Sequence, residues 1–347
     1  MGLRTYIITR ILLTIPTLLL LLTTVFLIMR VLPGDPVALH FEKKATPEQM
    51  DQMRHLLGLD KPLWAQYIDY IWGIVDVGYF LAHGYPDLGK SMQVTSEDVG
   101  SQIFSAFPAT LELAIYSMII ASVLGILLGV VAAKSYNSVL DHLIRGLGTV
   151  AYAVPVFFLG IVLQLIFGVY LHWLPTGLRI NLSVVEPPAT ITGLYTIDSL
   201  LEGNIIKFFE SFKALALPSL TLGIVLSGIF IRLTRMNMLE TLRLDFVTAG
   251  RARGLNEGTV TYGYALRNAF LPILTMIGLQ FAALLGGAIL TETTFSWPGL
   301  GRYIVQRINF RDYTAIQGAI VVFGLFVALV SLAVDILYAY LDPRIRL

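Results

Sequence analysis

The segment Leu113–Ala133 reads LAIYSMIIASVLGILLGVVAA, and it decides the fold. Its 21 residues include no charged side chain, although Glu112 and Lys134 stand directly on either side. A helix needs about 20 apolar residues to cross the hydrocarbon core of a membrane. The segment therefore predicts a membrane-spanning helix.

Five other apolar segments qualify, or nearly qualify, as spans. The first of them, Ile11–Met29, could instead be the apolar part of a signal peptide, because Arg4 and Arg10 precede it. Its length favours a retained helix, as does the absence of a small-x-small cleavage site in the following Arg30-Val-Leu-Pro33. The five segments are Ile11–Met29, Gly146–Tyr170, Ala214–Ile231, Phe270–Leu290 and Gly318–Leu341.

The composition of the 347 residues agrees with a membrane protein and excludes several other classes. Hydrophobic residues make up 56% and charged residues only 14%, whereas a soluble domain carries about a quarter charged residues. A net charge of +1 argues against a nucleic-acid-binding protein. The absence of cysteine excludes disulfides, thiolate catalysis and cysteine metal sites. The five histidines form no i/i+4 pair, which argues against a zinc-binding helix.

The distribution of basic residues predicts the orientation of the six spans. With the N-terminus inside, the cytoplasmic pieces are 1–10, 134–145, 232–269 and 342–347, and these 66 residues hold 12 Lys and Arg. The outer pieces contain 150 residues and also hold 12. Basic density is thus more than twice as high inside, as the positive-inside rule requires. We expect both termini to be cytoplasmic, in a multi-pass protein of the cell (plasma or inner) membrane.

The chain is expected to divide into an N-terminal transmembrane helix (1–31), an extracytoplasmic helical segment (32–107) and a core of five transmembrane helices (108–347). In the outer segment, Thr46-Pro-Glu-Gln49 predicts a capped helix start and Gly58 its end. A second helix is predicted to begin near Pro62. The outer loop 171–213 shows no periodicity and receives no assignment.

Residues Gly84-Tyr-Pro-Asp-Leu-Gly-Lys-Ser91 match the spacing of a phosphate-binding loop. Such a loop must follow a buried strand and open a helix, so that its backbone N–H groups converge on phosphates. Pro86 interrupts this one, no apolar strand precedes it, and the predicted topology places it outside the cell. We therefore interpret the match as a coincidence and expect no nucleotide site in this chain.

The predicted cytoplasmic segment Asp245-Phe-Val-Thr-Ala-Gly-Arg-Ala-Arg-Gly-Leu255 is rich in small residues. Its spacing predicts a short helix that Gly254 ends. Small side chains would allow a close partner, and the arginines could meet carboxylates or carbonyls. The alternative is that Arg251 and Arg253 only anchor the topology.

Two carboxylates in or near the spans and two glycines within one span have structural interpretations. We expect Glu112 to be hydrated near the outer surface, in a structural role. Asp335 should pair locally, near Tyr338 and Arg344, rather than relay protons. Gly125 and Gly129 form a small-xxx-small pair that favours close contact between helices.

Seven stretches together resemble one family, the permeases of dipeptide- and oligopeptide-type ABC importers, of the B-subunit kind. They occur in the family's order and run from the first span to the C-terminus. The most specific are ETTFSWPGLGR at Glu292–Arg302 and ALRNAFLP at Ala265–Pro272. The others are LPGDP at 32–36, LGLDKPLWAQYIDYI at Leu57–Ile71, ATLELA at Ala109–Ala114, AGRARGL at Ala249–Leu255 and DPRIR at 342–346.

The resemblance implies an all-α, type I ABC importer permease fold with six transmembrane helices and a coupling loop at 232–271. It implies that 245–256 is the coupling helix, with Thr248-Ala249-Gly250 standing where such permeases have Glu-Ala-Ala. The glutamate is absent here, which leaves the contact of residue 248 open. The implied contacts with the ATPase come from Thr248, Ala249, Gly250, Arg251, Ala252, Arg253, Gly254, Leu255 and Asn256.

The resemblance also implies the partners: a paralogous second permease, two cytoplasmic ATPase subunits that hold ATP and Mg²⁺, and an extracytoplasmic substrate-binding protein. This chain would carry no cofactor and catalyse no reaction, and it would form half of an alternating-access pathway for di- and oligopeptides. Oligosaccharides or nickel are alternative substrates. A stand-alone secondary transporter would need midplane ion ligands and repeated halves, and the sequence shows neither.

Overall fold

Helices form nearly all of the regular structure in the computed structural model, which describes residues 3–31, 37–38, 46–93 and 97–341. The stretches 32–36 and 342–346, which contributed to the family resemblance, and Arg344 lie outside the described residues. The α-helices are α1 (Leu3–Val31), α3 (Pro47–Leu56), α4 (Leu63–Val75), α5 (Val77–His83), α6 (Val99–Lys134), α7 (Val139–Ala153), α8 (Val156–Leu163), α9 (Tyr195–Leu201), α10 (Ile205–Thr241), α11 (Asp245–Ala252), α12 (Leu266–Gly287), α13 (Ile289–Thr294), α14 (Leu300–Asn309) and α15 (Tyr313–Leu341), and the π-helices are η1 (Gln164–Tyr170) and η2 (Thr259–Ala265).

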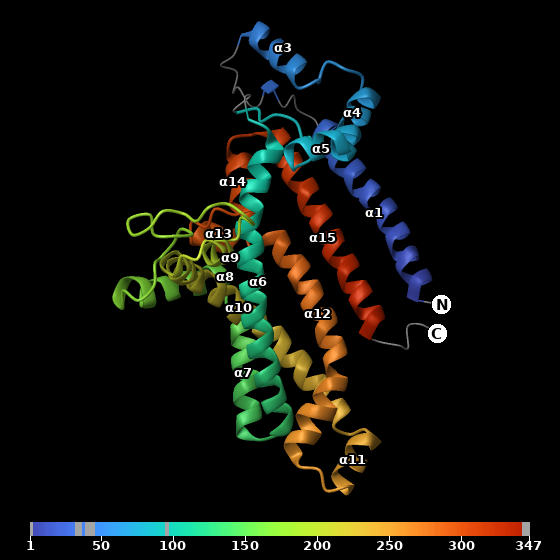
Figure 1. The fold of residues 1–347 in the computed structure, drawn as a ribbon, viewed down its shortest axis with the longest axis vertical. Helices are drawn as coiled ribbons and strands as arrows, with labels where there is room; N and C mark the ends of the chain where they lie inside the picture. The colour runs from blue at the N-terminus through green and yellow to red at the C-terminus, as the bar shows by residue number, and fades with distance from the viewer. Residues whose placement is uncertain (1–2, 32–36, 39–45, 94–96, 342–347) are drawn as a thin grey trace.

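Five helical segments are long and apolar enough to cross a membrane, and each contains or overlaps a predicted span. They are Ile7–Arg30, Val99–Lys134, Ile205–Thr241, Thr259–Leu285 and Tyr313–Leu337. The helices α6, α10, α12 and α15 run lengthwise through the molecule (Figure 1). The prediction of an all-α membrane protein is confirmed.

The third predicted span, Gly146–Tyr170, is not one continuous helix. Val139–Ala153 and Val156–Tyr170 are bent by 101° relative to each other. Val154 has an extended backbone (φ −71°, ψ 128°), because the ring of Pro155 disfavours the helical conformation for the residue before it. The segment is therefore a bent pair of helices, and it makes a sixth span only if the two helices are counted together.

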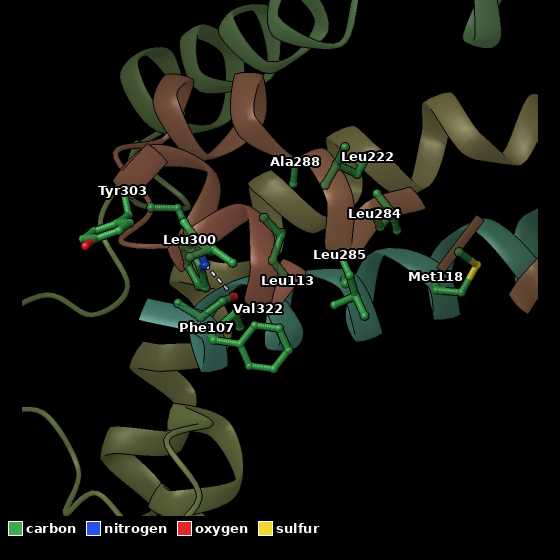
Figure 2. Packing of buried hydrophobic residues seen from close by; sticks show 14 of the residues in the cluster. Phe107, Leu113, Met118, Leu222, Leu284, Leu285, Ala288, Leu300, Tyr303 and Val322 are labelled. Carbon is green, nitrogen blue, oxygen red and sulfur yellow. Dashed lines mark hydrogen bonds between the residues drawn. The ribbon is translucent and has the colours of Figure 1, made fainter. Parts of the chain in front are cut away.

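The two longest helices, α6 and α10, pack directly against each other along the centre of the molecule. A Cβ atom on Gly125 would overlap the side chain of Phe230, and one on Gly129 would overlap Thr234. The close contact predicted from this glycine pair is thus confirmed. Around it, buried side chains of α6, α10, α12, α14 and α15 form the main core (Figure 2).

The predicted extracytoplasmic helices form at one end of the bundle, above α1 and α15 (Figure 1). Thr46 and Gln49 make the expected reciprocal capping box, and Gly58 takes φ +64° after α3. The second helix, α4, begins directly after Pro62. Tyr67 of α4 bonds Thr23 of α1 at 2.7 Å, so the segment is tied to the first span.

The first and last long helices are joined by an ion pair between Arg10 and Asp335 at 3.2 Å. Asp335 was expected to pair within its own neighbourhood. Its described partner instead comes from α1, more than three hundred residues earlier in the sequence.

Candidate functional site

The predicted contact segment forms the tip of the molecule opposite α3, α4 and α5 (Figure 1). The helix α11 lies between the end of α10 and the start of η2, at the turn of a helical hairpin. Val247 and Gly250 are its buried residues, and Val247 packs with Met238 of α10 and Val260 of η2. One face of α11 is thus fixed to the bundle.

The other face of α11 is open to solvent. Of the nine residues predicted to contact an ATPase, only Gly250 is buried, while Thr248, Ala249, Arg251, Ala252, Arg253, Gly254, Leu255 and Asn256 are exposed. Most of these side chains are small, which allows the backbone of a partner to approach closely. The structure therefore brings the predicted residues together on one accessible surface.

Gly254 follows the end of α11 in a left-handed backbone conformation, with φ +76°. Its N–H donates to the carbonyl of Arg251 at 2.9 Å, and the N–H of Leu255 donates to Gly250 at 3.3 Å. Glycine adopts this conformation without the steric cost that a side chain would add. A Cβ atom at Gly254 would meet no other atom within 4 Å, so the glycine is required for its φ and not for space.

Arg251 has a partner within the chain that the sequence did not predict. Its Nε and Nη2 donate to the two carboxylate oxygens of Glu257, at 2.9 and 3.3 Å. This hydrogen bond lowers the pKa of Glu257. The ion pair of Arg251 with Glu257 spans the turn at Gly254. The two residues are six positions apart, so the helical i/i+4 spacing did not predict the pair.

The stretch Glu292–Arg302 folds into a compact corner formed by α13 and α14. Glu292 is fully buried, accepting a hydrogen bond from Thr110 Oγ1 at 2.7 Å and one from the N–H of Arg302 at 2.8 Å. Burial raises the pKa of this carboxyl group, while the hydrogen bonds oppose that change. Trp297 Nε1 donates to the carbonyl of Ala109 at 2.8 Å, which fixes the corner to α6.

A buried ion pair holds the long loop before α9 against α6. Arg179 donates from Nε and Nη2 to one oxygen of Glu112, at 3.0 and 2.6 Å. The other oxygen accepts from the N–H and the hydroxyl of Thr196, at 2.8 and 2.7 Å. Glu112 is only 2% exposed, so the expected hydration was wrong. The paired charge and full hydrogen bonding make its burial tolerable.

The stretch that matches a phosphate-binding loop lies in a different structural context. The helix α5 precedes this stretch, and polar groups of the stretch form hydrogen bonds within the chain. The N–H of Gly89 donates to Asp87 at 3.0 Å, and that of Ser91 donates to the carbonyl of Glu97 at 3.2 Å. The hydroxyl of Ser91 donates to Asp312 Oδ2 at 2.5 Å. The bond from Ser91 to Asp312 joins the predicted outer segment to the turn before α15.

The apolar spans and the exposed helical tip define a multi-pass membrane protein. Comparison with known families is then decisive: residues 125–347 match the model of the binding-protein-dependent transport system inner membrane component, and residues 3–114 match the N-terminal model of such membrane components. The chain belongs to this family. The resemblance predicted from its motifs is confirmed.

Relatives match this chain over nearly its whole length. It is 41% identical to the dipeptide transport system permease protein DppB of Alkalihalophilus pseudofirmus, over 98% of this chain and 99% of that protein. It is 40% identical to the di/tripeptide transport system permease protein DppB of Pseudomonas aeruginosa, over 96% of each.

A solved structure is similar in fold. It is a chain of the methionine ABC transporter MetNI in an inward-facing conformation, with a TM-score of 0.51 and 16% identity. The match covers 67% of this chain and 93% of that one. The type I importer permease fold implied by the motifs is thereby confirmed.

Proposed function

We propose that this chain forms half of the translocation pathway of an ATP-driven importer for di- and oligopeptides. The full-length similarity to dipeptide and di/tripeptide permeases carries the proposal. It favours peptides over oligosaccharides or nickel. The remaining partners are a second, paralogous permease, two ATPase subunits that supply ATP and Mg²⁺, and an extracytoplasmic binding protein that delivers the peptide.

The substrate class is tested by uptake into vesicles that contain the reconstituted complex and its binding protein. A labelled dipeptide should accumulate when ATP is present on the ATPase side, and unlabelled dipeptide should compete. An oligosaccharide or Ni²⁺ should not. Uptake of either of these in place of the dipeptide would contradict the proposed substrate.

The surface formed by residues 248–256 is the proposed contact with an ATPase subunit. Three observations support it: its exposure, its small side chains and its position at the end of the α10–α12 hairpin. When the ATPase dimer closes, a helix fixed at Val247 would carry that motion into α10 and η2. The chain then couples ATP hydrolysis to a conformational equilibrium without a reaction of its own.

The proposed orientation predicts which residues an impermeant thiol reagent can reach. Since the chain has no cysteine, single cysteines can be introduced without background. Ser183 and Asn256 are both exposed and belong to opposite sides of the proposed topology. Ser183→Cys should react in intact cells, and Asn256→Cys only after permeabilisation. Labelling of Asn256→Cys in intact cells would exclude the six-span orientation.

Lys90 should have no role in nucleotide binding. It is exposed, and the neighbouring amides donate to groups of the chain itself. Lys90→Ala should therefore change the ATPase rate and nucleotide affinity of the complex no more than an ordinary surface substitution, within about 0.5 kcal/mol. A specific loss of ATP binding by this variant would contradict both the topology and the proposed function.

A further inference from the structure

A cleft of about 860 Å³ lies between α7 and α10, with Gln280 of α12 also on its wall. It extends from His142, near the start of α7, to Tyr152, close to the break before Pro155. The two helices touch where Gly148 and Gly228 meet, since a Cβ atom on Gly228 would overlap the carbonyl of Gly148. This contact fixes the two walls relative to each other.

Three arginines line this cleft, and one of them forms an ion pair with a residue buried behind it. Arg235 donates to both oxygens of the buried Asp141, at 2.7 Å each, so its charge is balanced. Arg145 and Arg232 are exposed, and neither forms an ion pair with a residue that the structure describes. The lining includes no acidic residue. Asp141 also interacts with Arg145 at longer range, so the three arginines and this one carboxylate leave a net excess of two positive charges at the cleft.

The lining mixes apolar side chains with three arginines and Gln280, and these charged and polar groups indicate that the cleft faces water and not lipid. Gln280 lies within the membrane-spanning segment Thr259–Leu285, and its described contact is a weak one, to Met276 Sδ at 3.8 Å. An amide directed into hydrocarbon costs free energy that this contact does not offset. Within a permease, the water-filled space at this depth is the translocation pathway.

We propose that this arginine cleft binds the terminal carboxylate of the imported peptide, through Arg145 and Arg232, after the pathway opens to the cytoplasm. The inference rests on the proposed function, because it assigns a substrate contact to the same pathway. A guanidinium matches a carboxylate with paired hydrogen bonds. Every linear peptide with a free C-terminus carries this group whatever its side chains. The volume lies in the range of small-molecule sites, and Gln280 and Tyr152 offer hydrogen bonds to the rest of the peptide.

The test uses the complete complex in nanodiscs, without nucleotide and without binding protein, and measures the equilibrium binding of L-alanyl-L-alanine and of its C-terminal amide. The dipeptide should bind, and the amide should bind at least about tenfold more weakly, because a charge-assisted contact contributes about 1.5–3 kcal/mol. Arg145→Gln and Arg232→Gln should each weaken dipeptide binding about tenfold. Neither should further weaken binding of the amide.

Arg243→Gln is the matched control, because Arg243 is exposed in the turn after α10 and does not line the cleft. It should bind the dipeptide as the native complex does. Equal affinity of the native complex for dipeptide and amide would overturn the inference, and that comparison needs no variant to fold.

The same cleft could hold the phosphate of an anionic lipid. A second part of the experiment distinguishes a lipid ligand from a peptide ligand. The binding measurements are repeated in nanodiscs of phosphatidylcholine alone and with phosphatidylglycerol. If the arginine variants change only the dependence on phosphatidylglycerol, the ligand is a lipid and the inference is wrong. Normal dipeptide uptake without any binding at the cleft would overturn this inference alone, whereas absent dipeptide uptake by the native complex would overturn the proposed function.

Discussion

Replacing Gly254 by Val should reduce peptide uptake about tenfold or more, while the chain still inserts into the membrane. The left-handed conformation at φ +76° costs a residue with a Cβ atom about 1–2 kcal/mol, and a β-branched residue more. A cost of this size shifts a conformational equilibrium by about tenfold. The end of α11 would then leave the geometry that the ATPase contacts. The measurement is peptide uptake and substrate-stimulated ATP hydrolysis by the reconstituted complex.

Gly203 provides a matched control for this substitution. It has φ +72°, no atom would lie within 4 Å of an added Cβ, and it sits in the turn between α9 and α10. Gly203→Val should introduce comparable backbone strain without uncoupling transport from hydrolysis. If both variants lower uptake equally, the effect of Gly254→Val is one of stability. Native uptake and hydrolysis in Gly254→Val would mean that α11 is not the coupling helix.

Replacing Arg179 by Ala should strongly destabilise the protein or prevent its assembly. The substitution leaves Glu112 buried with the hydrogen bonds of Thr196 but without its cation. Breaking a buried ion pair from one side costs about 3–5 kcal/mol. The measurement is the thermal unfolding of the purified complex, together with its yield from membranes.

The double variant Glu112→Gln/Arg179→Met should recover much of the loss, because it removes both charges and keeps similar volumes. The pair of Lys213 with Glu210 gives the surface control. It lies three residues apart on α10, with Lys213 about half exposed, so Lys213→Ala should cost no more than about 1 kcal/mol. An Arg179→Ala complex as stable as the native one would show that the pair does not hold the loop.

The spans and caps could be predicted because their signals are local in the sequence. An uncharged apolar stretch such as Leu113–Ala133 predicts a membrane-spanning helix by itself. The capping box of Thr46 and Gln49 likewise depends only on residues of the first helical turn. The break at Pro155 also had a local signal, but hydropathy alone does not register it. The apolar residues on both sides of the proline concealed the bend.

The proposed contact surface could be predicted because its nine residues are consecutive in the sequence. The other polar features combine residues that are far apart in the sequence. Glu112 meets Arg179 across 67 positions, and Arg235 meets Asp141 across 94. No sequence periodicity relates such distant residues. The loop before α9, for example, is held by side-chain hydrogen bonds and not by a repeating apolar face. The arginine cleft stayed unpredicted for the same reason, with walls from three separate helices.

The length of α10 gives the molecule a lever. Its 37 residues extend for about 55 Å at 1.5 Å per residue, well beyond a hydrocarbon core of about 30 Å. One end of this rod meets the turn that leads into α11, and the other meets the turn at Gly203. A tilt of only 2° about its midpoint would displace the two ends by roughly 1 Å in opposite directions. A displacement of α10 at one membrane surface would thus produce a displacement in the opposite direction at the other surface.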